Sequence, residues 1–297
     1  MIVDGKAIAE EIRRELENEV RALSRPPRLD IVLIGSDPAS AAYVKRKQAF
    51  GGSIGVRIVP HVFSGSERSG SEFAKIVAEI AGNSETDGVI VQLPLPEPLR
   101  AYTRSIMDSI PPEKDVDCLS TAVSQKFASG KNPIRPPLVS VVDEIFRRYD
   151  IDVRDKKIAL VGATGELVGK PIAQWLSSRD IPFSSITIET STDEMREILR
   201  NADIIISGVG NAGLITADMV KEGVIAIDAG TSGASGALKG DMDSAIAGKA
   251  KLFTPVPGGV GPITVAMLFR NLLTLIKIKG SPKGSPFLIP KDSPLDS

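Results

Sequence analysis

Residues 156–171, "KKIALVGATGELVGKP", carry the clearest indication of the fold. It begins with a continuous apolar run, typical of a strand buried on both faces of a sheet, and leads into a glycine turn at Gly162. We expect a helix to begin near Val168. Glycines let backbone N–H groups approach a pyrophosphate, and the N-terminus of the next helix favours its negative charge. The spacing is not G-x-G-x-x-G, so this stretch alone is a weak indication of a nucleotide site.

The surrounding pattern strengthens that indication. A second glycine-rich segment, "SGVGNAG" (207–213), follows another apolar run. Strands alternating with short helices indicate a parallel sheet that is covered on both faces. The second half of the chain is therefore predicted to be a Rossmann-type doubly wound parallel sheet that binds a dinucleotide. Its further strands are predicted at residues 184–190, 202–210, 223–230 and 250–256.

The first half of the chain shows the same alternation, which makes the whole protein α/β. Apolar residues at steps of four and three predict an amphipathic helix over 6–24. Strands are then predicted at residues 28–35, 55–63 and 87–96. Helices are predicted at residues 38–50, 70–81, 137–149 and 264–279.

Two α/β domains and a tail are expected from this layout. The first domain comprises residues 1–136 plus 263–280, and the dinucleotide-binding domain comprises 137–262. The last segment, 281–297, carries four prolines and cannot be a helix, so it is expected to be flexible or laid along the surface.

Composition excludes several classes of protein. Of 297 residues, Lys and Arg number 36 and Asp and Glu 37, which argues against a surface that coats nucleic acid. There is no run of 18 apolar residues, so no membrane-spanning helix is expected. The N-terminus lacks the apolar segment of a signal peptide, and the single Cys118 cannot form an internal disulfide. We therefore expect a cytoplasmic protein with neither nucleic-acid nor membrane partners.

The single histidine restricts the chemistry further. With one cysteine and one histidine, His61, the chain has little material for a Cys/His zinc site or a Cys-His catalytic pair. No metal is expected, and His61 is interpreted as a packed or surface residue in a strand. Proton transfer near neutral pH must then fall to Lys, Tyr, Asp or Glu.

Three short motifs in the first half carry such residues. In "YVKRK" (43–47), Tyr43 and Lys47 share one helix face, and burial beside other cations would lower the pKa of a lysine there. In "VQLPLP", Gln92 stands at the carboxyl end of a strand, where open α/β sheets bind ligands. In "KDVD", Asp115 and Asp117 alternate, so in an extended segment they would share a face. Such a carboxylate can bind the amino-pyrimidine edge of a pterin or simply cap a turn.

A fourth motif, "TPVPGGVGPIT" (254–264), mixes prolines that restrict the backbone with glycines that free it. Together and in this order, "YVKRK", "VQLPLP", "KDVD" and "PGGVGP" resemble the bifunctional methylenetetrahydrofolate dehydrogenase/methenyltetrahydrofolate cyclohydrolases. The resemblance covers the chain from "GKAIA" (5–9) to about Leu275.

The resemblance implies two α/β domains with a folate cleft between them. It implies oxidation of 5,10-methylenetetrahydrofolate by NADP, with NAD as an alternative, and then hydrolysis to 10-formyltetrahydrofolate. These steps belong to one-carbon metabolism, which serves purine, methionine and histidine biosynthesis. The family usually forms homodimers.

The resemblance also assigns residues by motif. Lys47 resembles the catalytic lysine of the cyclohydrolase step, Gln92 would position it, and Tyr43 would stack on the folate rings. Asp117 would grip the pterin. Other residues implied to bind the substrate are Leu93, Pro257, Gly258, Gly259, Val260 and Pro262. Residues implied to bind the dinucleotide are Gly162, Ala163, Thr164, Gly169, Glu189, Ser191, Gly208, Gly210 and Thr231.

The chain departs from the family pattern near the expected dinucleotide. The glycine turn, usually G-x-S-x-x-V-G, has one extra residue here, and Thr164 stands at the Ser position. Where the family has His-Ser and a cation for the 2′-phosphate of NADP, this chain has "ITIETSTDEM". An acid such as Glu189, near a strand end, often accepts the ribose 2′-OH of NAD, although Ser191 and Thr192 could still hold a phosphate.

The chain also departs from the family near the pterin. The usual Gly-Phe-His after the aspartate is Cys118-Leu119-Ser120, and "PIRP" (133–136) replaces "PCTP" and brings in Arg135. The rival interpretations are a dehydrogenase without hydrolase activity, a shikimate-type dehydrogenase and a non-enzymatic nucleotide-binding regulator. A carrier other than folate, of the methanopterin type, also stays open.

Overall fold

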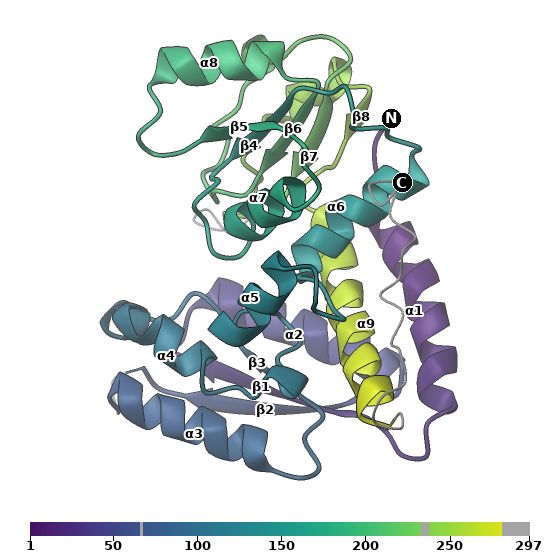
Figure 1. Ribbon diagram of the computed structural model, residues 1–297, viewed down its shortest axis with the longest axis vertical. Helices are drawn as coiled ribbons and strands as arrows, with labels where there is room; N and C mark the ends of the chain where they lie inside the picture. Colours follow the sequence, from purple (N-terminus) through teal and green to yellow (C-terminus); the bar gives the residue numbers. More distant parts are fainter. Residues whose placement is uncertain (66–67, 233–237, 281–297) are drawn as a thin grey trace. The chain divides into compact units, whose positions relative to one another are not determined.

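The computed structural model describes residues 1–65, 68–232 and 238–280 (Figure 1). The tail predicted at 281–297 lies outside the described residues. The chain forms two compact α/β units, which we call the first unit (residues 10–137 and 265–280) and the second unit (residues 1–9 and 138–264). The α/β class predicted from the sequence is confirmed.

The first unit contains a three-stranded parallel sheet in the order β2-β1-β3. One face of this sheet buries side chains of β1 and β3 against helices α3 and α4. The elements assigned to this unit alone are β1 (Arg28–Ile34), α2 (Pro38–Ser53), β2 (Arg57–Phe63), α3 (Gly70–Gly82), β3 (Gly88–Val91), the 3₁₀ turns η1 (Glu97–Tyr102) and η2 (Pro112–Lys114), α4 (Thr103–Met107) and α5 (Thr121–Ala128).

The second unit contains a five-stranded parallel sheet in the order β5-β4-β6-β7-β8. The chain runs outward in one direction from β4 to β5 and in the other from β6 to β8, so the switch point lies between β4 and β6. Its elements are β4 (Ile158–Val161), α7 (Gly169–Ser177), β5 (Phe183–Ile186), α8 (Thr192–Asn201), β6 (Ile204–Ser207), η3 (Ala217–Met219), β7 (Ile225–Asp228), η4 (Ser244–Gly248) and β8 (Leu252–Phe253).

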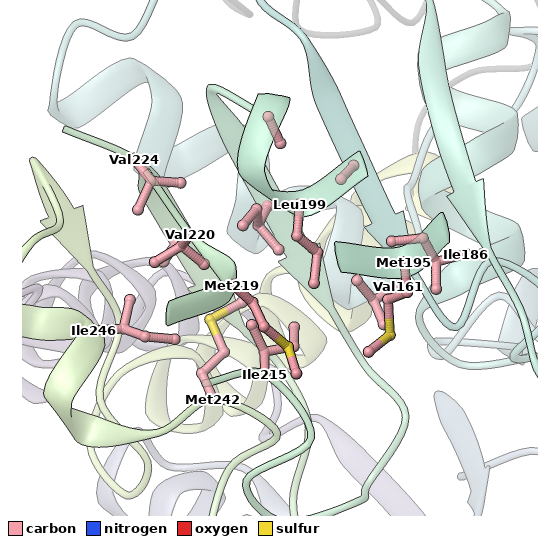
Figure 2. Packing of buried hydrophobic residues seen from close by; sticks show 14 of the residues in the cluster. Val161, Ile186, Met195, Leu199, Ile215, Met219, Val220, Val224, Met242 and Ile246 are labelled. Atoms are coloured by element: carbon pink, nitrogen blue, oxygen red, sulfur yellow. The ribbon is translucent and has the colours of Figure 1, made fainter. Parts of the chain in front are cut away.

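A buried cluster packs one face of the second sheet (Figure 2). Val161 and Ile186 come from its strands, and Met195 and Leu199 from α8, which covers that face. Trp175 of α7 is fully buried elsewhere and stacks on Phe146 of helix α6 (Pro137–Arg148). Because all five strands are parallel, their carboxyl ends and the loops after them lie at one edge of the sheet.

Three helices carry the chain from one unit to the other: α1 (Gly5–Arg21), α6 (Pro137–Arg148) and α9 (Val260–Gly280). Helix α9 is long and apolar enough to cross a membrane by composition alone. More than half of that apolar window is buried inside the protein, as in the core helix of a folded domain.

The structure differs from the sequence predictions in three places. Residues 1–9, expected in the first domain, cluster with the second unit, where Val3 N–H donates to the carbonyl of Phe253 (2.9 Å) at the edge of the sheet. The strand predicted at 87–96 ends at Val91, because Pro94 and Pro96 have no N–H for a sheet. The last helix begins at Val260 rather than 264, with Pro262 in its first turn, where no N–H is needed.

Candidate active site

Lys47 is a lysine on the buried face of a helix. Helix α2 starts at an Asp37 cap, whose carboxylate accepts the N–H of Ser40 (2.7 Å). The buried side of this helix carries Val44 and Lys47, whereas Lys45 is exposed. Only 9% of Lys47 is accessible to solvent. Because a lysine seldom lies on the buried stripe of a helix, its environment requires an explanation.

Gln92 supplies the hydrogen-bond partner of that lysine. Its backbone N–H donates to the carbonyl of Val32 (2.8 Å), which ties it to the end of β1. Its side-chain Nε2 donates to the carbonyl of Leu93 (2.7 Å), so Oε1 is left to face the lysine. Lys47 Nζ donates to this Oε1 at 3.0 Å in a buried setting. The end of β3 thus fixes the side-chain amide of Gln92, and this amide orients the amino group of Lys47.

Burial and a nearby carboxylate act on the protonation of this lysine in opposite directions. Burial lowers the pKa of Lys47, and the charge of Asp117 partly opposes that shift. Burial also raises the pKa of Asp117, and Lys47 counteracts it. Desolvation is the larger effect on the pKa of both groups, so the pKa of Lys47 is lowered and that of Asp117 is raised. A lysine in this setting can accept or release a proton closer to neutral pH than an exposed one.

Asp115 and Asp117 perform different tasks. Asp115 is fully buried, and its carboxylate accepts the N–H groups of Leu119 (3.2 Å) and Ser120 (2.8 Å), so it caps a turn. Asp117 interacts instead with the charge of Lys47. Residues 116 and 117 form a turn rather than an extended segment, so the condition for one shared face is not met here. Asp117 is the aspartate that accompanies the lysine.

Cys118 adopts a backbone conformation that favours glycine. Its φ is +58°, in the left-handed region, at the position where the family pattern has glycine. The side chain is buried, and Asn132 Nδ2 lies 3.9 Å from its Sγ. The substitution therefore keeps the turn after Asp117 at the cost of an unfavourable φ.

Tyr43 lies one turn before Lys47 on α2 and is partly buried. The guanidinium of Arg46 stacks over its ring, with 5.1 Å from Cζ to the ring centroid. The structure thus brings Tyr43, Lys47, Gln92 and Asp117 into one region of the first unit, and Leu93 holds the amide of Gln92 through its carbonyl.

Asn271 also belongs to this region, although no motif in the sequence pointed to it. This residue of α9 is buried, and its Nδ2 donates to the carbonyls of Val116 (2.9 Å) and Arg135 (2.8 Å). It therefore ties the segment before Asp117 to the last helix. An asparagine inside the apolar run "LFRNLL" was the signal that could have identified it.

The glycine turn of the second unit is packed tightly enough to require Gly169. The N–H groups of Gly162 and Ala163 both donate to the carbonyl of Ile186 (2.8 and 3.3 Å), which anchors the turn to β5. A Cβ at Gly169 would lie 1.9 Å from the carbonyl oxygen of Gly162. The turn therefore rests directly on the first residue of α7, while Thr164 is exposed at its tip.

The loops after β4 and β6 flank the switch point of the sheet. A Cβ at Gly208 would lie 2.4 Å from the side chain of Val168, so this glycine lets the second loop pack on the first. Gly210 is exposed in the loop after β6, and Thr231 follows β7. In doubly wound sheets a ligand binds at the carboxyl ends of the strands at such a switch point. The predicted dinucleotide residues of these loops thus lie at the appropriate edge.

The turn after β5 contains the predicted specificity residues. Glu189 is exposed, and its N–H donates to Oγ1 of Thr187 (3.2 Å). Ser191 is the cap of α8, and its Oγ accepts the N–H of Glu194 (3.3 Å). The first turn of α8 adds two acidic residues, Asp193 and Glu194. This turn therefore offers carboxylates to a ligand rather than a lysine or arginine.

The loop of "TPVPGGVGP" lies in the second unit and packs against the start of the chain. Gly259 N–H donates to the carbonyl of Pro255 (2.7 Å), which closes a tight turn before α9. A Cβ at Gly5 would lie 1.7 Å from the carbonyl oxygen of Gly259, so "GKAIA" approaches this loop as closely as only glycine allows. The structure places the predicted substrate residues of this loop at 257–262 in the turn and in the first turn of α9.

Comparison with known proteins identifies the family. The family model described as "Tetrahydrofolate dehydrogenase/cyclohydrolase, catalytic domain" matches residues 3–117, and that of its "NAD(P)-binding domain" matches residues 136–280. The chain is 36% identical over 285 residues to a bifunctional protein FolD of Sulfurihydrogenibium sp., which covers 94% of this chain and 98% of the relative. It is 38% identical over 281 residues to a bifunctional protein FolD of Nautilia profundicola (93% and 97% covered).

Solved structures agree. The bifunctional dehydrogenase/cyclohydrolase FolD of Campylobacter jejuni has a TM-score of 0.85 and 31% identity, covering 94% of this chain and 99% of that one. The Trypanosoma brucei enzyme, solved with NADP cofactor and an inhibitor, has a TM-score of 0.87 and 29% identity, covering 95% and 99%. Two family models that together span nearly the whole chain, and relatives of the same length, lead to one conclusion. The chain belongs to the tetrahydrofolate dehydrogenase/cyclohydrolase family.

Proposed function

We propose that this protein oxidises 5,10-methylenetetrahydrofolate to the methenyl form with NADP and then hydrolyses the product to 10-formyltetrahydrofolate. The observation that carries the hydrolase step is the buried hydrogen bond between Lys47 and Gln92. A dehydrogenase without hydrolase activity would not need a proton-transferring lysine there. The shikimate-type and regulatory alternatives are not favoured, because the matched relatives are bifunctional enzymes.

The hydrolase step follows from the protonation of Lys47. Water adds to the cationic methenyl carbon and loses one proton. As the bond from this carbon to one of its two nitrogens breaks to leave the formyl group, the remaining hydroxyl proton passes to that nitrogen. Neutral Lys47 can accept the proton that the water loses, and burial favours this neutral form. A protonated lysine would be repelled by the cationic substrate. Oε1 of Gln92 holds Nζ of Lys47 in position by accepting its hydrogen bond. The charge of Asp117 stabilises the lysine after it gains the proton.

The dehydrogenase step depends on positioning more than on side-chain chemistry. Bound NADP supplies the acceptor of the hydride. The residues that fit such a group are the glycine turn at Gly162–Gly165, the N-terminus of α7 at Gly169 and the loop after β6. Small residues and backbone N–H groups at a helix start suit a pyrophosphate. The exposed side chains of Leu167, Ile188 and Val209 at the same edge offer apolar surface to a planar ring.

The pH dependence of hydrolysis tests the role of Lys47. The rate should rise with pH, because the neutral lysine is the proton acceptor, and should be lost as pH falls below its folded-state pKa. Burial lowers that pKa, so the inflection should lie below about 10.4, the ordinary value for lysine. The measurement is the initial rate of methenyltetrahydrofolate hydrolysis against pH, corrected for the uncatalysed reaction. A rate that falls as pH rises through this range would exclude Lys47 as the base.

The choice between NADP and NAD is tested at Glu189. A carboxylate here can accept the ribose 2′-OH of NAD and would repel the 2′-phosphate of NADP. Glu189→Ala should therefore raise the KM for NAD about fivefold, as expected for one lost hydrogen bond, and leave that for NADP unchanged or lower. Glu197→Ala, at an exposed acid of α8 outside its first turn, is the matched control. Equal effects of Glu189→Ala on the two dinucleotides would contradict a contact with the ribose.

One turnover assay tests the whole proposal. Purified protein is given 5,10-methylenetetrahydrofolate with NADP or NAD, and the methenyl and 10-formyl products are both followed. Formation of 10-formyl product with NADP preferred supports the proposal. A preference for NAD would make Glu189 the specificity residue. No turnover with either dinucleotide would instead favour a carrier of the methanopterin type.

We also propose that the protein acts in the cytoplasm as a homodimer that supplies one-carbon units for purine, methionine and histidine biosynthesis. The near-neutral charge balance and the single cysteine support the location. Strand β2 supports the dimer, because it is at the edge of its sheet and exposes Val62, and an open edge can pair with a second copy. Sedimentation analysis would distinguish a dimer from a monomer.

A further inference from the structure

Two aspartates of the second unit are buried without a basic partner. Asp228 ends β7 and is 1% exposed, and Asp241 lies thirteen residues later and is 0% exposed. Among residues 1–65, 68–232 and 238–280, no lysine or arginine forms an ion pair with either. Their oxygens accept hydrogen bonds from backbone N–H groups and from one hydroxyl. Burying a carboxylate is costly unless each oxygen is satisfied, so this arrangement calls for a reason.

Asp241 holds the loop that follows β6. Its Oδ2 accepts the hydroxyl of Ser207 (2.7 Å) and the N–H of Val209 (2.7 Å), and its Oδ1 accepts the N–H of Asn211 (2.8 Å). These three donors come from five consecutive residues on the rim of the switch point. Among the described residues, no acceptor takes the N–H of Gly210 between them. The carboxylate therefore fixes the loop, and the N–H of the exposed residue Gly210 is left for a ligand.

Asp228 in turn holds Asp241. Its Oδ1 accepts the N–H of Asp241 (3.2 Å) and that of Gly230 (2.9 Å), and its Oδ2 accepts the N–H of Met242 (2.9 Å). The N–H of Asp228 itself donates to Oγ1 of Thr254 (2.7 Å), the first residue of the "TPVPGGVGP" loop. One chain of hydrogen bonds thus links the ends of three neighbouring strands, β6, β7 and β8.

This network is costly for the fold. Burial raises the pKa of Asp228 to about 6, and the adjacent charge of Asp241 contributes to the shift. Two buried carboxylates of the same charge also disfavour each other's ionised form, so the pair does not add stability as an ion pair would. Its consequence is a defined backbone at the edge where a doubly wound sheet binds its ligand.

We propose that Asp241, held in place by Asp228, is a positioning residue for the dinucleotide. It sets the backbone of residues 207–211 against which the dinucleotide rests, and it touches neither the folate nor the lysine of the hydrolase step. The inference depends on the proposed function, because it assumes that this edge binds NADP or NAD. It adds a residue that neither the glycine pattern nor the family motifs of the sequence indicated.

The test compares Asp241→Asn with wild type in the full chain. Asparagine has nearly the size of aspartate, but its Nδ2 donates hydrogen bonds where a carboxylate oxygen accepts them. At least one backbone N–H of the loop therefore loses its acceptor. The affinity for NADP and for NAD is measured directly by calorimetry, together with KM and kcat of the dehydrogenase, hydrolysis of methenyltetrahydrofolate without dinucleotide, and the melting temperature. Asp243→Asn is the matched control, because this exposed residue lies two positions away and only caps η4.

Asp241→Asn should weaken dinucleotide binding about tenfold and raise KM for the dinucleotide, with kcat at saturation and hydrolysis within twofold of wild type. Asp243→Asn should change none of these. Unchanged dinucleotide affinity, or an equal loss of affinity, kcat and hydrolysis, would overturn the inference, because it would indicate no role or a general loss of structure.

Ser207→Ala keeps the proposal testable if Asp241→Asn does not fold. This variant removes one donor to Asp241 and should weaken dinucleotide binding about threefold, whereas unchanged affinity would overturn the inference. If wild-type protein binds neither NADP nor NAD, the proposed function fails, and this inference fails with it. That outcome differs from one in which wild type and variants bind equally.

Discussion

Lys47→Met should abolish hydrolysis of 5,10-methenyltetrahydrofolate while the protein folds and still reduces NADP. Removal of a proton-transferring group typically costs 10²- to 10⁴-fold, so a loss of at least about 100-fold is expected. Methionine has nearly the length of lysine and no charge, and the position is 9% exposed, so the substitution suits its buried site. Hydrolysis is measured from added methenyl substrate, so that the dehydrogenase step cannot limit it.

The control for this variant is Lys45→Met. Lys45 is on the same helix, two residues away, and is exposed, so the change removes the same charge from α2 without altering the buried pair. Its hydrolysis rate should match wild type. If Lys47→Met hydrolyses as fast as wild type, Lys47 does not carry the proton and the hydrolase mechanism must be assigned elsewhere.

Gly169→Ala should give the opposite pattern, with dinucleotide use lost and hydrolysis retained. The added Cβ would lie 1.9 Å from the carbonyl oxygen of Gly162, which is a backbone atom, so the turn or α7 must move. Because the turn is also anchored to Ile186 through two N–H groups, it cannot shift freely. We expect KM for NADP to rise at least about tenfold and the melting temperature to fall by several degrees.

Gly248→Ala is the matched control for this variant. Gly248 lies in the same unit at the end of η4, and no atom is within 4 Å of a Cβ placed there. It should leave KM, kcat and melting temperature close to wild type. If Gly169→Ala binds NADP as wild type does, the glycine turn does not form the dinucleotide site.

The two large predictions separate the two activities between the two units. Lys47 belongs to the first unit and Gly169 to the second. If each variant loses only its own step, the steps have separable requirements within one chain. If either variant loses both the dehydrogenase step and the hydrolase step, the two steps depend on shared residues and are not separable in this way.

Local patterns predicted much of the fold and of the site. The alternation of apolar runs with amphipathic stretches predicted the parallel α/β units, because side-chain periodicity reflects which face of an element is buried. Motif spacing pointed to Lys47 and Gln92, and the structure joins them by a hydrogen bond. Family membership, first seen as a resemblance in short motifs, is confirmed by the family models.

Several features depended on contacts between residues far apart in the chain. The sequence alone determined that the protein is α/β, that it has a glycine turn after an apolar strand, and that a lysine and a glutamine stand in matching motifs. Long-range contacts were needed to show that residues 1–9 join the second unit through Phe253, that Asp115 caps a turn while the charge of Asp117 acts on Lys47, and that Asp228 and Asp241 are buried. The reason is that periodicity and turn chemistry act over a few residues. Burial and hydrogen bonding of a carboxylate are instead set by whichever distant backbone the fold places beside it.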